Sequence, residues 1–321
     1  MSRRKARKSN DPRQEGRRFT ARDWGGVNWP EGTGSKPVIG MVHLLPLPGS
    51  PGFSGDRRTL FSRAADDAKA LAKAGVSGLM MENYGDVPFY PGRVPRHVVA
   101  FMTAVAVHLR EEVDLPLGIN VLRNDGESAL EVAAAAEASF VRVNVLAGAR
   151  LTDQGLVQGI AHRLLRLRSI LKCPQVSVWA DVSVKHSAPL APLPMEAEVD
   201  DLLSRAGADA LLVTGTATGQ AVERDLLRTV QRQAKKVAER AERGGGEEGD
   251  AGLEHRSGGA PVLAASGVTR ENLKDLWAHV DGILVGSSVK EGGVAHNPVS
   301  LSRAGGLMEE VRRLEEERDA G

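Results

Sequence analysis

The sequence predicts an α/β protein of the (β/α)8 barrel class, in which eight parallel strands close into a ring. A strand-like segment followed by a helix-like segment recurs eight times along the 321 residues. Hydrophobic residues make up 41% of the chain and aromatic residues only 4%, which suits aliphatic strands buried on both faces. Polar side chains collect where the strand-like segments end, at the rim where such barrels bind ligands.

The strands are expected from short apolar runs that end in glycine, proline or polar residues. They are predicted at residues 37–45, 78–84, 116–122, 140–146, 176–183, 210–215, 261–267 and 281–288. Eight such units favour right-handed β-α-β crossovers and closure into a barrel. An open, doubly wound sheet is the alternative, but the glycine-rich turn typical of that fold does not follow the first strand.

The helices are expected where apolar residues recur at helical spacing. The first places Ala64, Ala68 and Leu71 on one face, and Gly75 is expected to end it, as glycine does just past a helix C-terminus. Helices are predicted at residues 59–74, 96–112, 127–138, 155–171, 196–206, 220–242, 270–277 and 298–318.

The barrel is predicted to span residues 37–318 as one domain, preceded by a basic tail. Residues 1–36 hold ten Lys or Arg and four Asp or Glu, without apolar periodicity, which predicts a disordered segment. An organelle-targeting segment and a nucleic-acid or membrane contact are alternatives for this tail. Residues 243–260 are rich in glycine and charge, and we expect a flexible insertion on the side of the barrel opposite the ligand site.

Charge and composition exclude several classes of protein. The formal net charge is +1, so no field across the whole molecule favours nucleic acid. No apolar run is long enough to span a membrane, and the single cysteine, Cys173, cannot form an internal disulfide. We expect a cytoplasmic homo-oligomer, with a mitochondrion or plastid as the alternative that the basic tail leaves open. A peripheral contact with a membrane or a protein complex also stays open.

A phosphate site is predicted at the ends of the seventh and eighth strands. Ser266 and Gly267 end one strand-like segment, and Gly286 and Ser287 lie at the end of the next. Small side chains let backbone N–H groups approach an anion closely, and the hydroxyls can assist them. The alternative is two tight turns that need glycine for their backbone angles.

Polar residues at the ends of other strands are predicted to bind the rest of the ligand. Asn83, Asn120 and Asn144 fall at similar depths on three successive strands, and amides in a row suit sugar hydroxyls or a polarised carbonyl. Asn124 and Thr214 belong to the same predicted ligand-binding rim. A closed amide network that only braces the barrel mouth is the alternative for the asparagines.

Five residues are candidates for catalysis, namely Asp181, Lys185, His186, His43 and Glu82. A lysine in a barrel mouth can form a Schiff base if burial lowers its pKa, or it can be a fixed cation that faces a phosphate or carboxylate. We favour the second role for Lys185. The histidines can act as acid or base near neutral pH, although His43 follows an apolar strand and can equally be structural.

Cofactors are not expected. Glu82, Asp86, Asp181 and the histidines could form an oxygen-rich pocket for a divalent cation, but no close pair of metal ligands such as His-x-x-x-His or Cys-x-x-Cys occurs. Neither a phosphate-binding Walker loop nor a Gly-x-Ser-x-Gly elbow is present.

Six segments, in this order, resemble the BtpA family over roughly residues 37–300. They are Ile39-Gly-Met-Val-His-Leu-Leu-Pro-Leu-Pro-Gly49, Glu82-Asn-Tyr-Gly-Asp86, Gly118-Ile-Asn-Val-Leu-Arg-Asn-Asp125, the span from Phe140-Val-Arg-Val-Asn-Val to Thr152-Asp-Gln-Gly155, Asp181-Val-Ser-Val-Lys-His186 and Ala264-Ala-Ser-Gly-Val268. The resemblance implies a barrel of the ribulose-phosphate-binding type. The matching positions suggest a shared site formed by His43, Glu82, Asn83, Asn120, Asn124, Asn144, Asp181, Lys185 and His186, without fixing their roles.

Two hypotheses for function follow. The first is a barrel that binds, and can transform, a small phosphorylated, sugar-like metabolite, as a lyase, isomerase or aldolase-like enzyme. The second is a non-enzymatic factor that assembles or stabilises a membrane protein complex, because the BtpA family is named for a factor in photosystem I biogenesis. The basic tail, the glycine-rich insertion and the last helix lie outside the resemblance.

Overall fold

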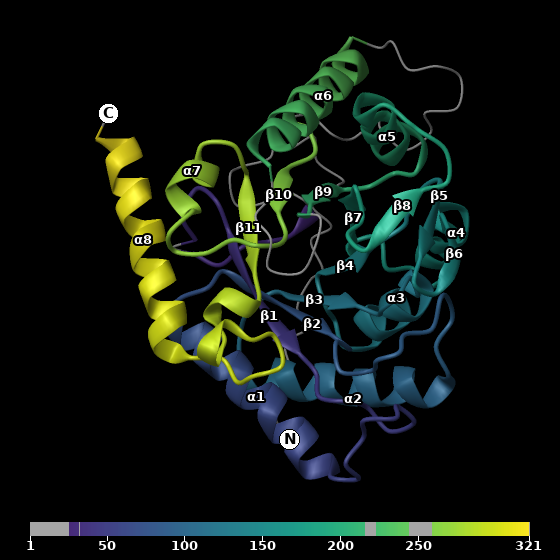
Figure 1. Ribbon diagram of the computed structural model, residues 1–321, viewed down its shortest axis with the longest axis vertical. Helices are drawn as coiled ribbons and strands as arrows, with labels where there is room; N and C mark the ends of the chain where they lie inside the picture. Colours follow the sequence, from purple (N-terminus) through teal and green to yellow (C-terminus); the bar gives the residue numbers. More distant parts are fainter. Residues whose placement is uncertain (1–25, 32, 216–222, 244–258, 321) are drawn as a thin grey trace, which may run out of the picture.

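The computed structural model describes residues 26–31, 33–215, 223–243 and 259–320, and eight of its strands form a closed parallel barrel (Figure 1). The predicted barrel is therefore confirmed, and the open sheet is excluded. The strands around the ring run β1-β11-β10-β9-β7-β4-β3-β2. They are β1 (Val38–His43), β2 (Gly78–Glu82), β3 (Leu117–Asn120), β4 (Phe140–Val143), β7 (Ser177–Val182), β9 (Ala210–Val213), β10 (Val262–Ala264) and β11 (Gly282–Val285).

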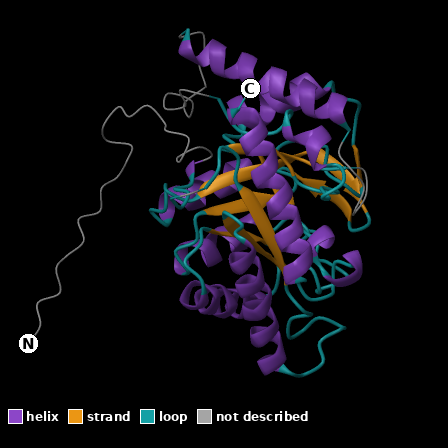
Figure 2. Ribbon diagram, turned by 90° about the vertical axis from the view of Figure 1, so that its left-hand side faces the viewer, coloured by secondary structure: helices purple, strands orange, loops and turns teal. Residues whose placement is uncertain are grey.

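Helices surround the strands on the outside of the barrel (Figure 2). Polar caps start several of them: the Asp56 side chain accepts a hydrogen bond from the Thr59 N–H at the start of α1, and Gly75, with φ +93°, ends that helix. The helices are α1 (Arg57–Ala74), α2 (Arg96–Glu112), α3 (Gly126–Ala135), α4 (Ala161–Ile170), α5 (Met195–Asp200), α6 (Arg224–Glu242), α7 (Leu273–Trp277) and α8 (Leu301–Asp319). A π-helical turn, Asp201–Arg205, extends α5.

The core has two parts because successive residues of a strand face opposite sides. The larger part lies between the strands and the helices, and includes Leu71 of α1 and Met102 of α2. The smaller part fills the barrel interior. Its members are Val27, Trp29, Ile39, Met41, Met80, Phe140, Trp179, Ala210, Leu212, Leu263, Ala265 and Leu284.

A tryptophan from the segment before β1 contributes to the interior. Trp29 is 2% exposed, and its ring lies 6.4 Å from the ring of Phe140 and 6.3 Å from that of Trp179. The Phe140 and Trp179 rings stack 4.0 Å apart. These rings fill the end of the barrel away from the polar rim. Trp24 and most of the predicted basic tail lie outside the described residues.

A three-stranded antiparallel sheet differs from the prediction. Residues 155–171 were expected as one helix, but β6 (Gly155–Gln158) pairs with β5 (Ala149–Thr152) in a hairpin, and α4 begins only at Ala161. The third strand, β8 (Ser187–Pro189), follows barrel strand β7 and pairs with β5. This sheet therefore joins the loops that follow β4 and β7.

The predicted flexible insertion lies outside the described residues, except at its two ends. Within the described ranges, every helix is too short or too polar to cross a membrane. Cys173 is buried.

Candidate functional site

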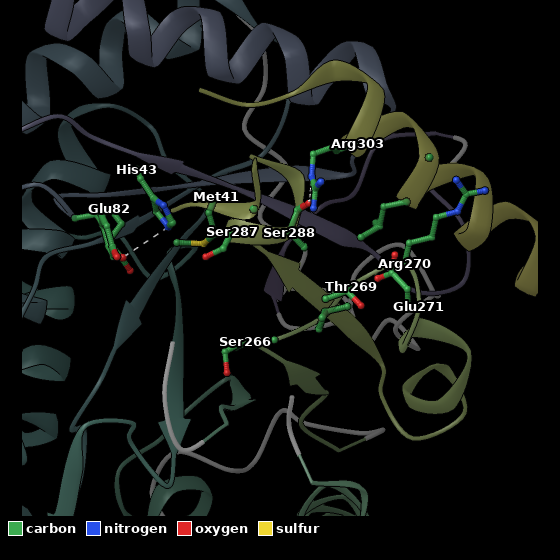
Figure 3. Close-up of a pocket in the computed structure, with 18 of the residues that line it drawn as sticks. Met41, His43, Glu82, Ser266, Thr269, Arg270, Glu271, Ser287, Ser288 and Arg303 are labelled. Atoms are coloured by element: carbon green, nitrogen blue, oxygen red, sulfur yellow. Dashed lines mark hydrogen bonds and ion pairs between the residues drawn. The ribbon is translucent and has the colours of Figure 1, made fainter. Parts of the chain in front are cut away.

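A pocket of about 460 Å³ lies at the carboxyl ends of the barrel strands (Figure 3). His43 and Glu82 lie at one end of it, Arg270 and Glu271 lie at the other, and Arg303 lies between them beside Ser288. We call it the rim pocket. It is lined by Met41, His43, Glu82, Tyr84, Arg142, Lys185, residues 265–271, residues 286–288, Gly293, Ser302, Arg303, Gly306 and Leu307.

A buried charge network supports the inner end of the rim pocket. Arg142 donates to both carboxylate oxygens of Asp181, from Nε at 2.8 Å and from Nη2 at 3.0 Å. Asn144 donates a third hydrogen bond to Asp181 at 2.7 Å, and Arg142 Nη1 lies 3.8 Å from Glu82 Oε2. Asp181 is thus fully engaged, and its side chain is not exposed. These contacts position Arg142 at the rim pocket.

Two amide oxygens in this network have no hydrogen-bond donor among the described residues. Asn120 donates from Nδ2 to the Arg142 carbonyl oxygen at 3.0 Å, but its Oδ1 is unpartnered, and so is Oδ1 of Asn144. Both residues are buried. Buried polar atoms without partners are costly, and they commonly mark places where a water or a ligand binds.

His43 has a defined tautomer. Its Nδ1 lies 2.9 Å from the Ala295 carbonyl oxygen, so Nδ1 carries the proton and Nε2 presents a lone pair. Its ring stacks on Tyr84 at 4.5 Å. Burial, followed by the charge of Lys290, lowers the pKa of His43 to about 3, so the ring is neutral near pH 7. The 4.0 Å approach of Nε2 to Glu82 Oε1 is therefore not an ion pair.

Glu82 and Lys185 carry opposite pKa shifts at the same end of the rim pocket. Burial raises the pKa of the Glu82 carboxyl, and the nearby Arg142 and Lys185 oppose that shift in part. Burial and the charge of Arg142 lower the pKa of the Lys185 amine. Each group is therefore moved toward its neutral form, as is common for groups that exchange protons with a ligand.

The predicted phosphate residues meet along one wall of the rim pocket. Ser266 accepts a hydrogen bond from the Gly215 N–H at 2.6 Å, and Gly267 has φ +64°. A Cβ at Gly286 would lie only 3.3 Å from Cε1 of His43, so the absence of a side chain there lets the imidazole approach this wall. Ser287 opens the 3₁₀ turn Ser287–Val289.

Other predicted residues do not line the rim pocket. The Asn83 side chain bonds the Leu122 N–H at 2.7 Å and Asp86 at 3.1 Å, while Asn124 is engaged with the backbone of Val145. These two amides brace loops. Thr214 donates to the Ser183 carbonyl oxygen, and His186 is exposed.

Three arginines at the site were not among the predicted residues. Arg142 is the central one, and its signal was visible, because a charged residue interrupts the apolar run Phe140-Val-Arg-Val143. Arg270 lies on the loop that follows β10, and Arg303 lies on α8, where only the fold brings it to the rim pocket. Arg303 Nε donates to the Ser288 carbonyl oxygen at 2.9 Å.

The described residues contain no group of three or more His, Cys, Asp or Glu side chains that could hold a metal ion. Asp86 accepts hydrogen bonds from Leu47 N–H and Asn83, and Asp181 is occupied by Arg142 and Asn144. The oxygen-rich cation pocket considered from the sequence is therefore not assembled in this part of the chain.

Comparisons with known proteins show the family of this chain. The model of the BtpA family matches residues 34–313. An uncharacterised protein of Thermococcus kodakarensis is 42% identical over 87% of this chain and 96% of its own length. The photosystem I biogenesis protein BtpA of Synechocystis is 38% identical over 85% of this chain and 87% of its own length.

Among solved structures, a Rubisco-like protein from Rhodopseudomonas palustris is similar with a TM-score of 0.50 and 14% identity, over 88% of this chain and 65% of that one. At this identity the likeness concerns the fold alone. The family match extends over most of the chain, and the two relatives are 42% and 38% identical to it over 96% and 87% of their own lengths. The chain therefore belongs to the BtpA family.

Proposed function

We propose that the rim pocket binds a small phosphorylated, sugar-like metabolite. The proposal rests on one observation: two walls of different chemistry face the same pocket. One wall consists of the glycine and serine residues that end β10 and β11, and the other presents a buried carboxyl, a neutral imidazole and an amine. The first wall suits an anion, and the second suits hydroxyl or carbonyl groups.

Charge supports a phosphate as the anion. The residues that line the rim pocket include four cations, Arg142, Lys185, Arg270 and Arg303, and two carboxylates, Glu82 and Glu271. Counted in their ordinary charge states, with His43 neutral and Arg142 balanced by its partner Asp181, they leave a surplus of one positive charge. A phosphate monoester carries close to two negative charges at neutral pH, so this surplus attracts it.

The opposite wall supports a hydroxyl-bearing ligand. His43 Nε2 and the Glu82 carboxylate can accept hydrogen bonds and receive none from the described residues, while Arg142 and Lys185 can donate. Sugar hydroxyls both donate and accept, so they can bond to all four groups.

A thermal-shift experiment tests the proposal. Ribose 5-phosphate and ribulose 5-phosphate are compared with inorganic phosphate and unphosphorylated ribose. A ligand at 100 times its Kd stabilises the folded state by about 2.7 kcal/mol, so the phosphorylated sugars should raise Tm clearly more than ribose does. The variant Ser287→Asp places a carboxylate in the phosphate wall and should lose the shift. Ser62→Asp, on the exposed face of α1, should keep it.

The proposal is wrong if phosphorylated sugars and ribose give equal shifts, or if Ser287→Asp keeps the full shift.

A second candidate function follows from the name of the Synechocystis relative, a photosystem I biogenesis protein. We propose as the alternative that the chain assists the assembly of a protein complex through an exposed surface. The three-stranded sheet supports this role, because the cross-strand neighbours Leu151 and Leu156 are 48% and 46% exposed. In that case Leu156→Asp would abolish complex formation, and Ser287→Asp would leave it unchanged.

A further inference from the structure

Lys185 differs from the other lysines that the barrel shields from solvent. Lys290 is fully buried, and its Nζ is paired with Asp67 Oδ2 at 2.8 Å. Lys36 is half-buried and donates to the Trp277 carbonyl oxygen. Lys185 is also half-buried and lines the rim pocket, yet its amine forms neither a hydrogen bond nor an ion pair with any described residue.

The neighbouring charges explain why this amine stays unpaired. Asp181, a buried acid near the end of β7, is held by Arg142 and Asn144. Glu82 lies 3.8 Å from Arg142 and 4.0 Å from His43, and it forms no ion pair with Lys185. Arg142 and Arg123 add positive charge around the amine, and together with burial they lower its pKa. A lysine beside other cations is a well-known route to a neutral, nucleophilic amine.

The backbone around Lys185 is fixed by its neighbours. Arg123 Nη2 donates to the Lys185 carbonyl oxygen at 2.6 Å, and β8 begins two residues later, at Ser187. Ser183 and His186 have φ of +53° and +54°, a conformation that residues other than glycine rarely adopt. Such backbone conformations cluster at functional sites, where the surrounding structure holds them.

We propose that Lys185, expected from the sequence to be a fixed cation, is instead a nucleophile that forms a Schiff base with the carbonyl carbon of a phosphorylated aldehyde or ketone bound in the rim pocket. This inference rests on the proposed function and deepens it, because it names the substrate class and the first chemical step.

The step balances without an oxidant or reductant. The lone pair of Lys185 Nζ forms a bond to the carbonyl carbon, and the carbonyl oxygen takes the proton of the Glu82 carboxyl. The resulting carbinolamine nitrogen gives a proton back to Glu82. Glu82 then protonates the departing hydroxyl, which leaves as water, and a carbon–nitrogen double bond remains. His43 Nε2, 4.0 Å from Glu82 Oε1, can accept a hydrogen bond from a ligand hydroxyl beside the reacting carbon.

Reductive trapping tests the inference. Protein is incubated separately with dihydroxyacetone phosphate and with pyridoxal 5′-phosphate, borohydride is added, and the modified lysines are located by peptide mass spectrometry. Lys185 should be modified at least about tenfold faster than the exposed Lys172, since binding raises the effective concentration of the carbonyl. Lys185→Met should lose this adduct, and Lys172→Met should keep it.

Labelling should also rise with pH around a midpoint below the ordinary pKa of a lysine. The inference is overturned if neither probe modifies Lys185 faster than Lys172. The variant Lys185→Arg separates a nucleophile from a fixed cation: it should keep the thermal shift given by dihydroxyacetone phosphate and form no adduct. If the wild type shows that shift without a Lys185 adduct, Lys185 is a fixed cation.

Failure of the proposed function gives a different result. Inorganic phosphate should slow the labelling of Lys185 by both probes if the phosphate wall binds their phosphate groups. Rapid labelling that phosphate does not slow would support the nucleophile and contradict the phosphate site. A thermal shift with dihydroxyacetone phosphate that occurs without an adduct would support the phosphate site and contradict the nucleophile.

Discussion

Glu82 is held in the barrel mouth at a cost to folding. It is 7% exposed, and burial raises the pKa of its carboxyl despite the nearby Arg142 and Lys185. When the pKa of a group is higher in the folded state than in the unfolded state, the folded state holds the proton more tightly. The stability that this adds is fully present below the unfolded pKa, and it is lost as the pH rises through the folded pKa. Above the folded pKa, therefore, the ionised carboxylate of Glu82 destabilises the folded state, as is common for functional residues.

The variant Glu82→Gln should therefore be more stable than the wild type near pH 7. The gain should be small near pH 4.5, grow as the pH rises through the folded pKa and then level off. It should amount to about 1.4 kcal/mol for each unit by which the pKa is raised. Urea unfolding from pH 4.5 to 8 measures it, and Glu111→Gln, an exposed change on α2, serves as the control. A constant difference across this range would contradict the shift.

The alternation of side chains between the two faces of a strand explains which site residues could be predicted from the sequence. Glu82 pairs in register with Asn120, and Asn120 with Arg142, so these side chains share the inner face at one level. Asn83 is one residue further along than Glu82, and that single step turns its side chain toward Asp86 and the Leu122 backbone instead. The sequence predicts which residues lie near the end of a strand. It does not predict whether the side chain of the last residue points into the barrel, because that depends on the residue at which the strand ends.

At the scale of elements, a buried ion pair ties the segment after β11 to α1. Lys290 and Asp67 are 0% and 2% exposed, and Asp67 Oδ1 also accepts a hydrogen bond from the Val299 N–H at 2.7 Å. The pair therefore fixes both ends of the segment that leads from Ser287 and Ser288 to the start of α8. Val299 and Lys290 also form a β-bridge.

Lys290→Met should cost about 3–5 kcal/mol, because it leaves the carboxylate of Asp67 buried without its partner. The double variant Asp67→Leu with Lys290→Met should recover part of that loss, and Lys274→Met, at an exposed position, should have little effect. Chemical denaturation measures all three. Equal destabilisation by the single and the double variant would show that packing, and not the unpaired charge, causes the loss.

The helix predicted at residues 155–171 shows where the spacing of apolar residues fails to predict secondary structure. Leu164 is the one buried residue that α4 offers to the core, and the apolar residues Leu156 and Val157 precede it closely enough to extend the pattern. In the structure, Val157 packs instead with Val145 and Val184 in a small separate cluster. Val184 follows β7, so the sequence around residue 157 does not contain the contact that makes it a strand. The barrel strands were predictable because each is a compact apolar run.

At the scale of the whole molecule, the barrel interior divides into an aromatic end and a polar end. Trp29, Phe140 and Trp179 fill the first, and the network of Arg142 and Asp181 fills the second. Trp29 precedes β1, so a segment outside the predicted barrel closes it. The homo-oligomer and the extent of the disordered tail stay predictions.

Trp29→Ala should destabilise the protein by about 3–5 kcal/mol, since it opens a cavity that the surrounding strands cannot fill. The loss should be seen as a lower urea midpoint. Val107→Ala, at a position that is 41% exposed on α2, should stay within about 0.5 kcal/mol of the wild type. A small effect of Trp29→Ala would mean that the barrel end is closed without it.

The hairpin of β5 and β6 has a consequence for how this barrel diversifies. Through β8 it is hydrogen-bonded to the short loop that carries Lys185, although it contributes no residue to the rim pocket. Insertions or deletions in the hairpin would therefore move the amine without altering any pocket-lining side chain. Relatives with identical pocket residues but hairpins of different length should differ in reactivity, and grafting one hairpin onto another relative is a direct way to transfer that difference.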